Sequence, residues 1–243
     1  MCGIVGYIGG KAVPEVLLGG LQRLEYRGYD SAGLALVANG RLHCTKSVGK
    51  VQVLAEHLRA LPDQTPLEQA ACGIAHTRWA THGAPTQDNA HPHMDQTGQI
   101  ALVHNGIIEN YREIRHHLEA QGHTFLSQTD SEVLAHLVGA CYDGDLLSAV
   151  CSALRRVEGA FGIAVVCADQ PDRLIAARRG SPIVVGVADN ETFVASDAAA
   201  IATHTSRVVY LDDDDVAVMT ADGLDIRNID NIPVSREIAS LDW

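Results

Sequence analysis

Hydrophobic and polar residues alternate along this chain with two different periods. Apolar runs rich in β-branched residues predict buried strands over 2–8, 31–38, 73–80 and 99–108. Apolar residues that recur every three or four positions predict helices over 13–27, 51–61, 110–122, 131–143 and 146–159. Thr129, Asp130 or Ser131 is expected to cap the fourth of these helices, because each side chain can accept a bond from a free backbone N–H.

From Gly159 onward the pattern is almost entirely that of strands. They are predicted over 160–168, 172–179, 182–188, 191–198, 207–212 and 215–223. The connections between them are short, which favours hairpins and antiparallel sheets over parallel crossovers. The sequence therefore predicts an α+β fold with four layers, in the order helix, sheet, sheet, helix. We expect a single domain over 1–243, and the polar segment from about residue 229 resembles the start of a linker.

Composition narrows the class of protein. The chain has 243 residues, 47% of them hydrophobic, and a formal net charge of -12, which fits a globular protein with a sizeable core. No cluster of Lys and Arg is available to neutralise phosphates, so nucleic acid is not an expected partner. The N-terminus lacks a basic segment and no apolar run has the length of a membrane-spanning helix, so neither a signal peptide nor a membrane partner is expected. The cysteines lack CxxC spacing, which is typical of a reduced compartment, and we predict a cytoplasmic protein.

Cys2 follows the initiator methionine and has two interpretations. It can be a buried structural residue at the start of a strand, since free cysteine behaves as a small hydrophobe. Alternatively, removal of Met1 would leave Cys2 with a thiol and a free α-amino group on one residue. Their ordinary pKa values are about 8.5 and about 7.7–8.0, so the amine could take the thiol proton directly or through a water. Cys2 would then be an N-terminal nucleophile that needs no distant histidine.

A motif at the end of a predicted strand concentrates groups that bind carboxylates. In GIAHTRWATHGAP the planar guanidinium of Arg78 is suited to hold a carboxylate through two parallel hydrogen bonds. Thr81 and His82 could add donors to the same oxygens, and Trp79 could act as a lid. These four residues are candidates for substrate binding.

Two glycine-containing motifs are further candidates. In RLEYRGYDSAG, Arg27 and Asp30 either brace a loop beside the N-terminus or belong only to a helix end and a turn. In LVHNGIIEN a predicted strand ends on Asn105 and Gly106, whose side-chain amide and backbone N–H are a suitable pair of donors for an oxyanion. Asn-Gly is also the strongest short-range signal for a hairpin turn, and the two interpretations are compatible.

The remaining polar clusters leave alternatives open. Asp130 is either a helix cap or a carboxylate that meets a substrate ammonium group. A zinc site is a rival interpretation of five histidines near Cys72, although their spacing matches neither HExxH nor a CxxC pair. These histidines are His76, His82, His91, His93 and His104. The acidic run LDDDDVAV lacks the glycine and distal Glu of an EF-hand loop, which favours a solvated hairpin turn over a calcium site. No metal and no cofactor are expected.

Taken in order, the opening MCG and the motifs RLEYRGYDSAG, HTRWATHG and HNGIIENY resemble the class II glutamine amidotransferases, a branch of the N-terminal nucleophile hydrolases. The resemblance covers essentially the whole chain. It is greatest to the branch that transfers glutamine nitrogen to fructose 6-phosphate. It implies the αββα sandwich of antiparallel sheets of that fold family, and hydrolysis of L-glutamine through a thioester on Cys2. Another class II amidotransferase, of the amidophosphoribosyltransferase kind, and a histidine-rich metal-binding protein remain the alternatives.

The resemblance also implies a role for each motif residue. Those matched to catalysis are Cys2 as nucleophile, Asn105 and Gly106 as oxyanion hole, and Arg27 as support of the terminal residue. Those matched to glutamine binding are Arg78, Thr81 and His82 for its α-carboxylate, Asp130 for its α-amine and Trp79 for closure. The implied partners are L-glutamine and a C-terminal pair of sugar-isomerase domains, toward which residues from about 229 to 243 would lead, in a homodimeric longer protein. The ammonia would there convert fructose 6-phosphate to glucosamine 6-phosphate.

Overall fold

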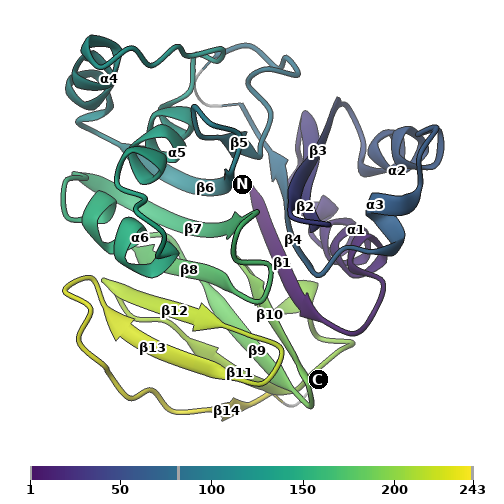
Figure 1. The fold of residues 1–243 in the computed structure, drawn as a ribbon. Helices are drawn as coiled ribbons and strands as arrows, with labels where there is room; N and C mark the ends of the chain where they lie inside the picture. Colours follow the sequence, from purple (N-terminus) through teal and green to yellow (C-terminus); the bar gives the residue numbers. More distant parts are fainter. Residues whose placement is uncertain (1, 81–82, 242–243) are drawn as a thin grey trace.

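Two antiparallel sheets form the centre of the molecule (Figure 1). The computed structural model describes residues 2–80 and 83–241. The first sheet contains β1 Gly3–Gly9, β2 Ser31–Ala38, β3 Arg41–Val48, β4 Cys72–Arg78, β9 Val184–Ala188, β10 Glu191–Ala195, β11 Arg207–Tyr210 and β14 Ala239–Ser240. The second contains β5 His93–Met94, β6 Ile100–Ile108, β7 Gly159–Cys167, β8 Leu174–Arg179, β12 Asp215–Met219 and β13 Leu224–Asn228. Their spatial orders are β14-β11-β9-β10-β1-β4-β2-β3 and β13-β12-β8-β7-β6-β5.

Helices cover the outer face of each sheet (Figure 1). On the first sheet lie α1 Val13–Arg23 and α2 Val51–Arg59, and on the second lie α5 Asp130–Ala140 and α6 Leu146–Leu154. The other helical elements are α4 Tyr111–Ala120, which packs on α5, α3 Thr65–Glu68, and the 3-10 turns η1 Glu25–Arg27 and η2 Ala198–Ala200. This arrangement confirms the predicted four layers. Over residues 2–80 and 83–241, the helices are too short or too polar to span a membrane.

Alternate residues of the central strands face different layers, as the period of two requires. In β1, Val5 and Tyr7 pack toward α1, whereas Ile4 and Ile8 belong to the core between the two sheets. A slip of the register by one residue would exchange these faces, so burial on both sides holds the pairing of β1 with its neighbours. This fixed register decides which side chains reach the space between the sheets.

The structure departs from the sequence prediction at several elements. The segment RLHCTKSV is an unpredicted edge strand, β3, whose side chains are mostly half-buried and mostly polar. The helix expected over 13–27 ends at Arg23 and continues as the separate turn η1. The expected hairpin at LDDDDVAV is wrong, because residues 211–214 connect β11 of one sheet to β12 of the other. Near the end of the chain, β14 pairs with β11, and Arg236 donates to both carboxylate oxygens of Asp215 at 2.7 Å.

Candidate active site

Rows of side chains from both sheets run through the core between them and end in polar residues. Along β4 the row is Cys72, Ile74 and then His76, and along β6 it is Ala101, Val103 and then Asn105. On β1, Ile4 belongs to the same core and Cys2 precedes it by two positions. Side chains two apart in a strand share a face, so the polar member of each row points the same way as its apolar neighbours. The hydrogen bonds described below join these three polar residues.

Cys2 lies half-buried beside the end of β4. Its Sγ accepts a hydrogen bond from the backbone N–H of Trp79 at 3.2 Å and lies 3.6 Å from the Trp79 carbonyl oxygen. The next residue, Gly3, donates its N–H to the hydroxyl oxygen of Thr77 at 3.1 Å. Burial raises the pKa of the Cys2 thiol above its ordinary value. The sulfur is therefore held in place and remains protonated near neutral pH unless a base takes its proton.

Asn105 reaches Cys2 from the other sheet. Its Nδ2 donates to the Cys2 carbonyl oxygen at 3.2 Å, and its Oδ1 lies 2.9 Å from Nε2 of His76. The expectation that the strand ends in a turn at Asn105 and Gly106 is wrong, because both residues lie inside β6 and pair with β7. Gly106 has a φ of 127°, and a Cβ there would lie 2.2 Å from the carbonyl oxygen of Ala160. Glycine is required at this position for conformation and for space.

A small cavity opens in front of Cys2 and collects most of the predicted site residues. Its lining comprises Cys2, Arg78, Trp79, His91, His104, Asn105, Gly106, Thr129, Asp130 and Ser131. Arg78 is buried, and its guanidinium donates to the carbonyl oxygens of Ala84 at 3.3 Å and Gly83 at 3.4 Å. Trp79 keeps 52% of its surface exposed. Thr81 and His82, the other two residues expected to bind the carboxylate, lie outside the described residues.

Asp130 and the start of α5 form another wall of the cavity. The helix cap is Thr129, whose side chain accepts from the N–H of Glu132 at 3.2 Å. The structure therefore decides among the three expected caps and leaves Asp130 as the first helical residue. Its carboxylate is buried and accepts from the N–H of Ile108 at 2.8 Å. A negative charge at a helix N-terminus is stabilised by the helix dipole.

The segment that contains Arg27 contacts the loop after β4 through Asp30 and Gly28. Asp30 accepts from the N–H of Ala80 at 2.6 Å, and a Cβ on Gly28 would lie 3.1 Å from the ring of Trp79. Arg27 does not line the cavity as far as the described residues define it. Its guanidinium pairs with Asp197 and donates to the hydroxyl of Tyr26. Asp197 was not expected from the sequence, since it lies far along the chain with no local motif around it.

The central histidines bind one another and nearby protein groups. His76 stacks on His91 with ring centroids 4.0 Å apart, and His91 Nδ1 accepts from the N–H of His104 at 3.2 Å. His93 Nε2 lies 3.0 Å from the hydroxyl of Thr129. Burial lowers the pKa of His76 to about 3 and also lowers the pKa of the other three rings. Within the part of the chain that the structure describes, no three His, Cys, Asp or Glu residues are grouped so as to hold a metal ion.

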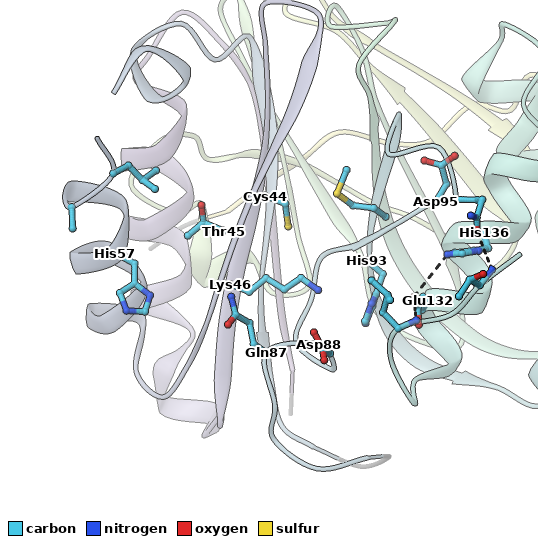
Figure 2. A pocket seen from close by; sticks show the side chains of 16 residues that line it. Cys44, Thr45, Lys46, His57, Gln87, Asp88, His93, Asp95, Glu132 and His136 are labelled. Carbon is cyan, nitrogen blue, oxygen red and sulfur yellow. Dashed lines mark hydrogen bonds and ion pairs between the residues drawn. The ribbon is translucent and has the colours of Figure 1, made fainter. Parts of the chain in front are cut away.

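A larger cleft of about 820 Å³ lies between β3 and α2 on one side and β5 and α5 on the other (Figure 2). Two of its charged side chains are engaged by the protein itself. Glu132 accepts from the N–H groups of Leu126 and Ser127, and Lys46 donates to the carbonyl oxygen of Ala90 at 2.8 Å. These contacts stabilise the surrounding loops. The cavity in front of Cys2, where a thiol meets an amide, an arginine and a carboxylate, is the candidate active site.

The comparison with known families agrees with this geometry. The family model described as a glutamine amidotransferase domain matches residues 76–203, which is more than half of the chain. The chain belongs to this family. Five residues that line the cavity and are catalytic or binding candidates from the sequence lie within the matched range: Arg78, Trp79, Asn105, Gly106 and Asp130.

Relatives of this amidotransferase domain carry a more specific name. The glutamine--fructose-6-phosphate aminotransferase (isomerizing) of Chlorobaculum tepidum is 51% identical over 247 residues, and that of Thermus thermophilus is 51% identical over 243 residues. The alignments cover 100% of this chain but only 40% and 39% of the two relatives. The chain thus spans about two fifths of the length of the curated relatives it matches.

Solved structures share the fold at lower sequence identity. The glutamine phosphoribosylpyrophosphate amidotransferase of B. subtilis, complexed with ADP and GMP, superposes with a TM-score of 0.78 at 22% identity. A structure of the allosteric regulatory enzyme of purine biosynthesis gives 0.79 at 23%. Each covers 94% of this chain and 49% of the other. The likeness to these two structures agrees with the predicted αββα sandwich of antiparallel sheets.

Proposed function

We propose that this amidotransferase domain hydrolyses the side-chain amide of L-glutamine to glutamate and ammonia through a thioester on Cys2. One observation carries the proposal. The Cys2 thiol and the Asn105 amide meet at the same cavity, and the Asn105 Nδ2 bonds to the Cys2 carbonyl at 3.2 Å. A nucleophile beside a fixed donor is the pair that amide cleavage needs, because negative charge develops on the carbonyl oxygen as the sulfur attacks.

The base in this proposal is the α-amino group of Cys2, exposed when Met1 is removed. Burial raises the pKa of the thiol, so the resting sulfur holds its proton. An α-amine with a pKa of about 7.7–8.0 is partly deprotonated at neutral pH and increasingly so above it, and its free-base form can accept that proton. The resulting thiolate attacks the amide carbon and forms the C–S bond. The protonated amine then returns its proton to the leaving nitrogen as the C–N bond breaks, and water hydrolyses the thioester to glutamate and free thiol.

Charged groups on opposite walls of the cavity are proposed to bind the amino-acid end of glutamine. Arg78 ends β4 and is proposed to bind the α-carboxylate, with Thr81 and His82 adding donors. Asp130 begins α5 and is proposed to bind the α-amine. Both side chains are buried, so each charge acts in a medium where its attraction for an opposite charge is stronger than in water. Trp79 is proposed to close over the substrate, and Arg27, fixed by Asp197, to support the terminal residue.

We further propose that the chain is one domain of a longer protein that passes the ammonia to fructose 6-phosphate and forms glucosamine 6-phosphate. Relatives that are 51% identical over the whole chain bear the corresponding name and are about two and a half times its length. Residues from about 229 to 243 would lead into the sugar-isomerase domains. A homodimer and a location in the cytoplasm belong to the same proposal.

Glutamine hydrolysis by this chain tests the proposal directly. We expect purified, Met1-processed protein to release glutamate and ammonia from L-glutamine in equal amounts, and Cys2→Ala to release neither. Cys141→Ala is the matched control, since this other half-buried cysteine lies at the end of α5 and does not line the cavity. Activity that survives in Cys2→Ala would refute the proposal. Incubation with fructose 6-phosphate and glutamine together should yield glutamate without amino sugar, because the residues assigned here all belong to glutamine hydrolysis.

A further inference from the structure

The orientation of the Asn105 amide is set from its far side. Nδ2 donates to the Cys2 carbonyl oxygen, which leaves Oδ1 facing Nε2 of His76 at 2.9 Å. An amide oxygen can only accept a hydrogen bond, so His76 Nε2 must carry the proton. A neutral imidazole has one N–H, so Nδ1 of His76 is then an acceptor. It has no hydrogen-bond partner among the described residues.

We propose that His76 is a positioning residue for glutamine hydrolysis, whose Nε2–H holds the Asn105 amide with its NH₂ group turned toward Cys2. The inference rests on the proposed function and adds to it a residue that does not touch the substrate. With the proton on Nδ1 instead, two acceptors would face each other at Nε2 and Oδ1. The amide would then rotate and present its oxygen to the place where the oxyanion forms, which would repel the developing charge.

The protonation state of His76 is held by its surroundings. The residue is 1% exposed and burial lowers its pKa to about 3, so the ring is neutral throughout the pH range in which an amine base can work. Stacking on His91 fixes the plane of the ring, with 14° between the two planes. His91 is fixed in turn by the N–H of His104. The ring is therefore neutral and its plane is fixed, so the proton that Asn105 Oδ1 requires on Nε2 points at that oxygen.

The local structure makes room for this arrangement. His76 pairs across the sheet with Gly33 of β2, and a Cβ on Gly33 would lie 2.1 Å from the carbonyl oxygen of His91. The missing side chain lets the backbone at His91 lie directly against β2. The ring of His91 then covers the ring of His76. The glycine at the end of the RGYDSAG motif thus serves the histidine stack.

A purely structural role explains His76 poorly. It occupies the next place in the row of Cys72 and Ile74, both of which belong to the apolar core between the sheets. An apolar residue would continue that row without a polar atom to satisfy. A buried polar atom without a partner costs roughly 1–3 kcal/mol, and the Nδ1 atom of His76 is such an atom among the described residues. The bond to Asn105 is the contact that an apolar residue could not supply.

Two substitutions separate positioning from packing. His76→Gln places an amide nitrogen where Nε2 stands and keeps the donor, whereas His76→Leu keeps a buried side chain without it. We expect kcat for glutamine hydrolysis to fall about 10- to 100-fold in His76→Leu, with KM changed less than about twofold, and to stay within about fivefold of the parent in His76→Gln. Equal losses in both variants, or a change confined to KM, would overturn the inference.

A double variant and a spectroscopic measurement complete the test. If His76 acts through Asn105, adding His76→Leu to Asn105→Ala should lower kcat no further, and losses that multiply would refute the inference. Two-bond ¹H–¹⁵N correlation of the unmodified protein should show His76 neutral with the proton on Nε2. A proton on Nδ1 or a charged ring would overturn the assignment. This measurement needs no activity, so it tests His76 even if the chain fails to hydrolyse glutamine, which would refute the proposed function instead.

Discussion

The Asn105 side chain donates to the carbonyl oxygen of Cys2 at 3.2 Å from the opposite sheet, although 103 positions separate the two residues. The contact joins the two layers at the end of their common core. It also puts an N–H donor next to the residue that carries the thiol. A donor held there before the substrate arrives needs no reorganisation when charge develops on the substrate oxygen.

Asn105→Ala should therefore lower the rate of the chemical step much more than the affinity for glutamine. Loss of one oxyanion donor typically reduces kcat about 100- to 1000-fold. Steady-state kinetics of glutaminase activity would measure the split between kcat and KM. Asn110→Ala is the control, because Asn110 bonds to the backbone of Arg156 and Glu158 outside the cavity. A raised KM with unchanged kcat would assign Asn105 to binding of the ground state.

Removal of Met1 should switch the enzyme on. With Met1 retained, the nitrogen of Cys2 is part of a peptide bond and cannot take the thiol proton, and the pKa of the thiol is raised by burial. We expect protein with an intact Met1 to release little ammonia and the processed protein to be active. Intact mass spectrometry would give the processed fraction in each preparation, and activity should rise in proportion to it. Full activity in unprocessed protein would exclude the amine as the base.

The rows of alternating side chains on β4 and β6 show how much of the site can be predicted from the sequence alone. The alternations Cys72, Ile74, His76 and Ala101, Val103, Asn105 are visible in the sequence, and they predict that each polar residue shares the face of its apolar neighbours. The sequence does not say that these two faces meet, because β4 and β6 lie in different sheets and their contact arises only when the sheets pack. The role of His76 was missed for this reason, and it was considered only as a zinc ligand.

Elements with a strong local pattern were predicted, and those that depend on distant neighbours were not. The helices α2, α4 and α5 follow apolar periodicity and agree with the predicted bounds within three residues, whereas α6 ends at Leu154, five residues before its predicted end. The edge strand β3 has a weak pattern because its side chains are mostly polar and half-buried. The pairing of Arg27 with Asp197 joins segments 170 positions apart, and no local signal marks the partner. Long-range contacts of this kind were beyond prediction from local pattern.

Acid should begin to destabilise the fold at a higher pH than protonation of its carboxylates alone would. Burial lowers the pKa of His76 to about 3 and lowers the pKa of His91, His93 and His104, whereas an unfolded histidine titrates near about 6.5. Below pH about 6.5 the unfolded chain therefore binds more protons than the native state. The contribution of the buried neutral rings to the free energy of unfolding is fully present above that pH. It falls as the pH decreases, by up to about 1.4 kcal/mol per pH unit for each ring.

Urea unfolding between pH 7.5 and 5.5 would measure this loss. His76→Gln should make the pH dependence of the unfolding free energy shallower, by up to about one proton at the acid end of this range, since glutamine does not titrate. His116→Gln should leave it unchanged, because His116 is exposed on α4. An identical slope in all three proteins would show that the central histidines do not control acid stability.

Gly33→Ala should damage both the fold and the catalytic site. The added Cβ would lie 2.1 Å from the carbonyl oxygen of His91, a backbone atom that cannot rotate away, so β2 and the segment at His91 must separate. Such overpacking costs about 1–3 kcal/mol, and each 1 kcal/mol lowers the Tm of a protein of this size by roughly 2–4 °C. The separation should also loosen the stack of His91 on His76, so kcat should fall even where the protein remains folded.

Gly223→Ala is the matched control, since no atom lies within 4 Å of a Cβ there, and it should change stability by less than about 0.5 kcal/mol. Thermal unfolding, and glutaminase assays well below the Tm, would compare the two variants. Equal stability and equal turnover in both would show that the close approach of His91 to β2 contributes neither to the fold nor to catalysis.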